Sequence, residues 1–265
     1  LHHRAGLWEW WPTYVSCSGP DEAIRLVTAL PLRYPPRSER HYSDLGFMIV
    51  GRAVEEVTGL RLPDAFAELV GTPLGLSGIR YGGPPAGTAA AASSPGDRGE
   101  RRMIETGEPY PVPVDASRFD RWRNHVLVGE VDDGNAFHTF GGAAGHAGLF
   151  GTVAALHALG RALLDSASGR GIWSPDVVHE FWTNGPDDGQ LLGFWSRTTV
   201  VGSCRAQAIG HTGFPGVGFA VLPEHDASVV LATNRLHVRG EPARFVPMWS
   251  TALDAAHATL HAAHQ

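Results

Sequence analysis

The sequence predicts an α+β fold in which an antiparallel sheet is flanked by helices and accompanied by a helical and irregular region. Two observations favour this fold. Four short runs of apolar and β-branched residues follow one another between residues 191 and 234. Apolar residues then recur at helical spacing across residues 243–264. We expect this closing helix to cover one face of the sheet.

Two helices are expected in the first third of the chain. Apolar residues recur at helical spacing across residues 42–59, where Gly59 supplies a C-terminal stop and Asp44 is expected to cap the first turn. A second, shorter helix is expected at residues 62–71, because Pro63 suits a first helical turn.

Residues 82–140 are expected to form a loop-rich insertion within one domain that spans residues 1–265. The segment 82–99 is rich in Gly, Pro, Ala and Ser without apolar periodicity, and the segment 100–140 is Pro-rich and irregular. For residues 82–99, the simplest interpretation is a surface excursion without a function of its own.

Two further helices are expected before the sheet. Thr152 is a suitable N-cap for a helix at 152–165. In the segment 174–182, Ser174 can cap the helix and Pro175 can occupy its first position. The strands that follow are expected to form an antiparallel meander; their residues are 191–201, 204–211, 216–223 and 227–234.

Charge and hydropathy exclude several classes of protein. The chain has 27 acidic and 21 basic residues, a net charge of -6, and every basic residue is arginine. No clustered basic stripe is present, so no nucleic-acid partner is expected. No apolar run approaches the roughly 18–20 residues that span a bilayer, so no transmembrane segment is expected. A small molecule is therefore the expected partner, while compartment and oligomeric state stay open.

No metal or other cofactor is expected from the spacing of cysteines and histidines. Cys17 and Cys204 do not form a short-spaced pair, and the histidines, among them His146, lack the His-Glu-x-x-His spacing of a zinc site. His257, with His261 and His264, falls on or near one helix face close to the terminus. We expect that face to be solvated.

Three short motifs indicate chemistry. Tyr42-Ser43-Asp44 begins a predicted helix, "GGAAGHAGLFGT" (141–152) leads into another, and His211-Thr212-Gly213 ends a predicted strand. Glycines at 213, 216 and 218 permit close backbone approach, so a ligand could lie along that edge. On its own, the His-Thr-Gly stretch favours a glycine-rich hairpin that carries an incidental histidine, because a lone short motif is weak evidence of a site.

In this order the motifs resemble the serine β-lactamase-like hydrolases, a family related to class C β-lactamases, D-alanyl-D-alanine carboxypeptidases and serine esterases. "HRAGL" (3–7) is similar to the family's His-Thr-Ser-Gly-Leu turn, which adds a fourth motif. The resemblance implies hydrolysis of an ester or amide through an acyl-enzyme formed on a serine. It places Tyr42 as proton shuttle and makes Asp44 the counterpart of an asparagine that orients Tyr42 or the substrate amide.

The same resemblance assigns the His-Thr-Gly strand to substrate binding. His211, Thr212 and Gly213 would line the wall opposite the tyrosine, with Thr212 hydrogen-bonded to substrate. The backbone N–H of Phe214 would be one of two oxyanion donors. Histidine replaces lysine at position 211, and a histidine is mostly neutral at pH 7. Ester or amide substrates without a required carboxylate are therefore expected ahead of penicillins.

The chain departs from the family pattern at the nucleophile. The family's Ser-x-x-Lys motif needs a lysine, and this chain contains none. Ser77-Gly78-Ile79-Arg80 has the spacing, but arginine stays protonated and cannot take a proton. We expect the domain to be N-terminally incomplete, with the nucleophilic serine upstream of residue 1. The alternative is a non-catalytic binding or regulatory relative that lacks the nucleophile.

Overall fold

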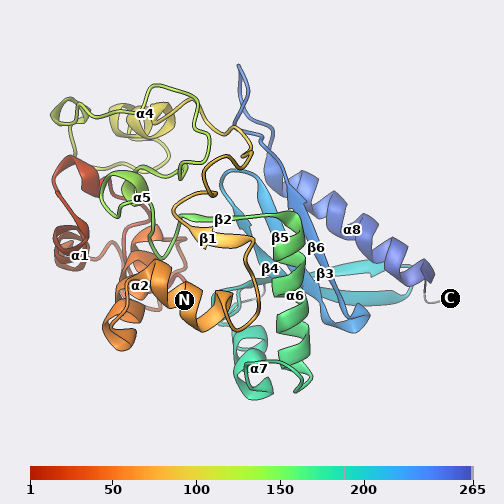
Figure 1. The fold of residues 1–265 in the computed structure, drawn as a ribbon. Coiled ribbons are helices and arrows are strands. Elements are labelled where there is room, and N and C mark those ends of the chain that lie inside the picture. Colours follow the sequence, from red (N-terminus) through yellow and green to blue (C-terminus); the bar gives the residue numbers. More distant parts are fainter. Residues whose placement is uncertain (188, 264–265) are drawn as a thin grey trace. The chain divides into compact units, whose positions relative to one another are not determined.

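The structure, a computed structural model, describes residues 1–187 and 189–263. These residues form two compact units. The first unit comprises Leu1, His3–Thr72 and Ile79–Phe150, and the second comprises His2, Pro73–Gly78 and the chain from Gly151 onward. Figure 1 shows the first unit in red to green and the second mainly in green to blue.

The first unit is mainly helical. Its longest helix is α2 (Asp44–Thr58), and a two-stranded sheet pairs β1 (Ile79–Tyr81) with β2 (Leu149–Gly151). The other helical elements are η1 (Thr13–Val15), α1 (Pro20–Ala29), α3 (Leu62–Phe66), η2 (Ala67–Gly71), α4 (Arg98–Thr106), η3 (Ala116–Arg118) and α5 (Gly134–His138). The helices expected at 42–59 and 62–71 are thus confirmed, the second as α3 continued by the π-helical turn η2.

The start of α2 differs in one respect from the prediction. Ser43, and not Asp44, caps the helix, because Ser43 has extended backbone angles and its Oγ accepts a hydrogen bond from the Gly46 N–H at 3.2 Å. Asp44 is the first helical residue. The helix ends as expected at Gly59, which adopts a left-handed conformation with φ 70°.

The region 82–140 contains two helices that the sequence pattern does not reveal. In α4 only Ile104 is buried, so the helix has no apolar stripe for a periodicity argument to find. The single-turn helix α5 is capped by Asp133, whose side chain accepts from the Ala136 N–H at 2.7 Å. A buried ion pair between Asp97 and Arg123, 2.7 Å apart, ties this region together.

The second unit is built on the predicted meander. The strands are β3 (Trp195–Val201), β4 (Cys204–Gly213), β5 (Val217–Leu222) and β6 (Ala227–Ala232), antiparallel in the order β3-β4-β5-β6. Three helices accompany them (Figure 1): α6 (Val153–Ala167), α7 (Pro175–Thr183) and α8 (Phe245–Ala263). The 3-10 turn η4 (Pro223–His225) joins β5 to β6. The predicted caps Thr152 and Ser174 are confirmed.

Helices cover both faces of this sheet. Ile209 and Val221 pack with residues of α6 and α7, whereas their neighbours Ala208 and Ala220 pack against α8. Successive side chains of a strand point to opposite faces, and the alternation produces the two cores. The α+β prediction is confirmed, and the sheet is covered by α6 as well as by the closing helix.

Helix α8 corrects one expectation. Trp249, Leu253 and His257 follow one another at a spacing of four, and all three side chains are buried. His257 is 0% exposed, so the predicted solvated face is wrong at this position. His264 lies outside the described residues. No helix among the residues that the structure describes is long and apolar enough to cross a membrane.

Candidate active site

Tyr42 lies two residues before the first residue of α2, and the residue is 51% exposed. The ring stacks on His3 at a centroid distance of 4.3 Å, and His3 Nδ1 accepts a hydrogen bond from the Ser43 N–H at 3.0 Å. Partial loss of hydration, and then the negative charge of Asp44, raise the pKa of Tyr42 to about 12. Tyr42 is therefore a protonated phenol near neutrality, and a cation would be needed to make it a base.

Asp44 follows the cap, and its backbone N–H donates to the Glu9 carbonyl at 2.9 Å. Burial raises the pKa of Asp44 to about 6, and the charge of Asp133 adds to this rise. The positive charge of His146 opposes both. A carboxyl with this pKa exchanges its proton close to physiological pH, which is unusual for an aspartate.

His146 and Asp133 form a buried ion pair. His146 Nε2 and Asp133 Oδ1 are 3.0 Å apart, and the side chains are 3% and 16% exposed. Burial alone would lower the pKa of His146, but the charge and the hydrogen bond of Asp133 outweigh it and raise this pKa to about 9. His146 is thus an imidazolium near neutrality, and it acts electrostatically on Asp44.

Two glycines hold the segment around His146 against α2. A Cβ atom on Gly145 would overlap the Phe47 carbonyl oxygen, and one on Gly51 would lie 2.9 Å from the Gly145 N atom. Only glycines allow the two backbones to approach this closely. Gly145, directly before His146, therefore has a structural cause, because it lets this segment lie against α2.

Glu100 is a further buried carboxyl, and it contacts the residue that follows Asp133. Glu100 of α4 accepts hydrogen bonds from the Tyr14 hydroxyl at 2.7 Å and from the Gly134 N–H at 2.6 Å. Burial, followed by the charge of Asp133, raises the pKa of Glu100 to about 8. The region 82–140 therefore supplies carboxyl groups to the interior of the first unit.

His211, Thr212 and Gly213 form the end of β4, as the motif predicts. Their Cα partners on β5 are Phe219, Gly218 and Val217, respectively. His211 Nδ1 lies 2.8 Å from the Thr212 carbonyl oxygen, and burial lowers the pKa of His211. The imidazole is consequently neutral at pH 7, which agrees with the charge expected from the sequence.

The three glycines of this hairpin have different surroundings. A Cβ on Gly218 would run into the Trp249 ring, and one on Gly216 would meet Thr233 and Arg235. A Cβ on Gly213 would find its nearest neighbour, a Pro215 atom, only at 3.7 Å. Close packing of protein atoms thus explains Gly216 and Gly218, whereas a Cβ on Gly213 would make only ordinary van der Waals contacts.

Phe214 occupies the turn after β4 and is 68% exposed. Arg235 holds this residue: its Nε and Nη2 atoms donate to the Phe214 carbonyl at 3.1 and 2.9 Å, and its guanidinium lies 5.5 Å from the ring centroid. Arg235 is not among the predicted site residues. The one sequence signal for it is that it directly follows the last predicted strand, which ends at residue 234.

The predicted residues thus fall into two groups. Tyr42 and Asp44 belong to the first unit, and the stretch from His211 to Phe214 belongs to the second. His146, Asp133 and Glu100 are not among the predicted site residues. His146 lies within the quoted "GGAAGHAGLFGT" motif, but nothing in its spacing shows that a distant aspartate would charge it. None of the predicted residues lines the cavity of about 620 Å³ between α6, α7 and the sheet.

Known proteins place this arrangement in context. A family model described as "Beta-lactamase" matches residues 1–252. Curated relatives include a putative D-alanyl-D-alanine carboxypeptidase of Escherichia coli, 27% identical over 231 residues and covering 82% of this chain and 50% of the relative. An N-acetylmuramyl-L-alanine amidase of Bacillus subtilis is also 27% identical, over 228 residues, with 82% and 49% covered. The chain spans about half the length of these relatives.

Solved structures share the fold. A penicillin binding protein from Bacillus halodurans superimposes with a TM-score of 0.62 at 17% identity, over 97% of this chain and 72% of that one. A D-amino acid amidase from Ochrobactrum anthropi gives a TM-score of 0.64 at 17% identity, over 100% and 71%. At these identities the likeness concerns the fold alone.

Proposed function

Because this chain belongs to the β-lactamase family, we propose that it forms the part of a serine hydrolase that carries the proton shuttle and the substrate-binding strand. The observation that carries the proposal is the place of Tyr42 immediately before the N-cap of α2, in a chain matched by the family over residues 1–252. The names of the relatives, a carboxypeptidase and two amidases, support cleavage of a carbonyl substrate.

The reaction would proceed through an acyl-enzyme. A serine hydroxyl attacks the substrate carbonyl and gives up its proton, a C–O or C–N bond breaks, and the leaving group takes a proton. Water then attacks the acyl-enzyme and releases the acid. We place the serine and its lysine base outside residues 1–265, because the chain contains no lysine and a base of this type must be able to lose its proton.

Tyr42 would move the proton between the nucleophile and the leaving group. Its pKa of about 12 makes it a proton donor at neutrality, and a neighbouring lysine ammonium would lower that pKa enough for it to accept a proton. The charge of His146 lowers the pKa of Asp44 and so favours its ionised form. Ionised Asp44 in turn raises the pKa of Tyr42. Asp44 would orient Tyr42 or the substrate amide.

The end of β4 would bind the substrate. Thr212 would hydrogen-bond to it, Gly213 would let it approach the backbone without a side chain in the way, and the Phe214 N–H would donate to the oxyanion. Neutral His211 offers no cation for a carboxylate, which favours ester or amide substrates without one. The absence of lysine supports a second candidate, a non-catalytic binding or regulatory relative.

Two observations separate the candidates. The reading frame upstream of Leu1 should encode Ser-x-x-Lys if the protein is a hydrolase, whereas a start codon directly before Leu1 would favour the non-catalytic relative. A fluorophosphonate probe should then label the protein that carries this motif, and peptide mass spectrometry should locate the label on that serine. Failure of the folded protein to react would contradict the proposal.

A further inference from the structure

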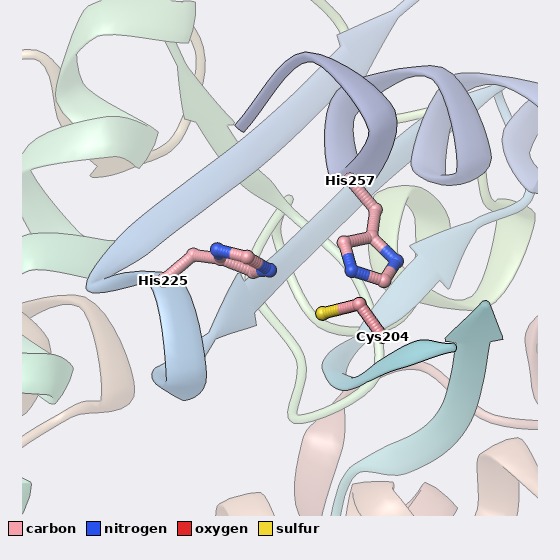
Figure 2. Close-up of side chains that lie close together, drawn as sticks. All are labelled: Cys204, His225 and His257. Carbon is pink, nitrogen blue, oxygen red and sulfur yellow. The ribbon is translucent and has the colours of Figure 1, made fainter. Parts of the chain in front are cut away.

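Three side chains with metal-binding atoms meet at one end of the sheet in the second unit. Cys204 is the first residue of β4, His225 ends η4, and His257 lies on α8. One ligand atom of each, the sulfur and one nitrogen from each imidazole, lies within 4.8 Å of the other two. Figure 2 shows a ring nitrogen of His225 and one of His257 turned toward each other, with the Cys204 sulfur close to both.

His257 is the part of this cluster that packing does not explain. Its side chain is 0% exposed, and neither Nδ1 nor Nε2 has a hydrogen-bond partner among the residues that the structure describes. A buried imidazole without partners loses its hydration and gains nothing in return, so such groups are rare in folded proteins. The His225 ring, 5.0 Å away between centroids and tilted by 55°, packs beside it.

The fold brings these groups together from three distant segments. A two-residue turn between Val201 and Cys204 places the cysteine at the end of the β3–β4 hairpin. His225 lies in the connection from β5 to β6, and the spacing of four along α8 turns His257 toward the sheet below Leu253. No local spacing connects the three, which is why a sequence motif cannot show them.

We propose that Cys204, His225 and His257 bind a zinc ion. Sulfur and imidazole nitrogen are the donors that zinc prefers, and the cluster has no carboxylate of the kind that calcium or magnesium requires. Tetrahedral coordination places such ligand atoms about 3.3–3.6 Å apart, so closure needs only small side-chain movements. Zinc replaces the proton of the Cys204 thiol, both imidazoles bind as neutral groups, and water takes the fourth position.

The ion would connect two hairpin ends to α8. This inference departs from the expectation of no metal, and it does not depend on the proposed hydrolase function. Because its three protein ligands come from β4, η4 and α8 of one unit, the bound ion would stabilise the folded sheet and its closing helix.

Cobalt(II) provides the direct test, because it occupies zinc sites and absorbs light. The metal-free chain should bind one Co²⁺ with intense visible bands of tetrahedral coordination and a thiolate-to-cobalt charge-transfer band, and one equivalent of Zn²⁺ should abolish both. C204S should lose the charge-transfer band. C17S should keep it, since Cys17 lies in the other unit.

A second variant guards against misfolding, because replacement of buried His257 could unfold the chain. H225A changes a partly exposed turn residue; it should keep the parent's circular dichroism and lose the tetrahedral spectrum. A folded chain that gives no charge-transfer band would overturn the proposal. So would a band that survives in C204S, or cobalt binding by H225A equal to the parent's, since other histidines would then be the ligands.

Discussion

His146 and Asp133 form an ion pair of 3.0 Å inside the first unit, beside the first turn of α2. The histidine comes from a glycine-rich segment and the aspartate from the cap of a one-turn helix. This pair links the region 82–140 to Asp44 and thereby to Tyr42, because the charge of His146 acts on Asp44 and that of Asp44 acts on Tyr42.

The ion pair predicts a pH-dependent stability. Its contribution is complete below the ordinary histidine pKa of 6.5 and is lost as pH rises through about 9, because the folded-state pKa is the higher one. His146→Gln would leave Asp133 buried without a counter-charge, at a cost of about 3–5 kcal/mol. Urea denaturation between pH 6 and 10 measures the free energy of unfolding of the parent, which should fall as pH rises, and of His146→Gln, which should be lower at pH 6.

His125 offers the control for that experiment. It forms a 2.6 Å pair with Glu130, but its side chain is 59% exposed. His125→Gln should change the free energy of unfolding by less than about 1 kcal/mol. If His146→Gln also changed the free energy of unfolding by less than about 1 kcal/mol at pH 7, the buried ion pair would not be a major source of stability.

Replacement of Asp44 should raise the stability of the chain at neutral pH, whereas replacement of His146 should lower it. Its pKa is about 6 in the fold and 3.8 ordinarily, so ionisation destabilises the folded chain increasingly as pH rises through this window. Asp44→Asn should equal the parent in stability near pH 3.5 and exceed it at pH 7 by up to about 3 kcal/mol. Urea denaturation at both values tests this, and a variant less stable than the parent at pH 7 contradicts it.

Gly145 should tolerate no side chain. In Gly145→Ala the new methyl group would overlap the Phe47 carbonyl and push the His146 segment away from α2, which should cost about 1–3 kcal/mol. Gly99 in α4 is the matched control, since a Cβ there meets nothing within 4 Å. Gly99→Ala should stabilise the chain by about 0.5–1 kcal/mol. Thermal unfolding of both variants separates steric overlap from a general effect of alanine.

His211→Lys tests the substrate preference. In the protein that carries the nucleophile, a lysine there should raise kcat/KM for a carboxylate-bearing substrate about tenfold relative to its neutral ester, the size of one charge-assisted hydrogen bond. His179→Lys, on the exposed surface of α7, adds the same charge elsewhere and should not change the ratio. An unchanged ratio in His211→Lys would contradict the proposal that the neutral charge of His211 sets the substrate preference.

Periodicity and capping residues were sufficient to predict α2, α3, α6, α7, α8 and the four strands of the second unit, because each carries an apolar pattern or a strong terminal signal. Helix α4 was not predicted because it buries only Ile104, and α5 because it is one turn long. Helix α1 was also not predicted, although Pro20 at its first position and acidic residues in its first turn are helix-start signals. The motifs placed Tyr42 directly before the cap of α2 and His211 on β4. The partnership of His146 with Asp133 could not be predicted, since it depends on the approach of two backbones at Gly51 and Gly145.

We propose that Tyr42 moves the proton in a serine acylation. The most direct measurement is the rate of fluorophosphonate labelling by the protein that carries Ser-x-x-Lys, compared with Tyr42→Phe and with Tyr34→Phe as control. Tyr34 donates to the His3 carbonyl at 3.3 Å and has no assigned chemical role. Without the proton shuttle, the labelling rate should fall about 10²–10⁴-fold in Tyr42→Phe alone. Equal labelling rates in Tyr42→Phe and the parent would contradict it.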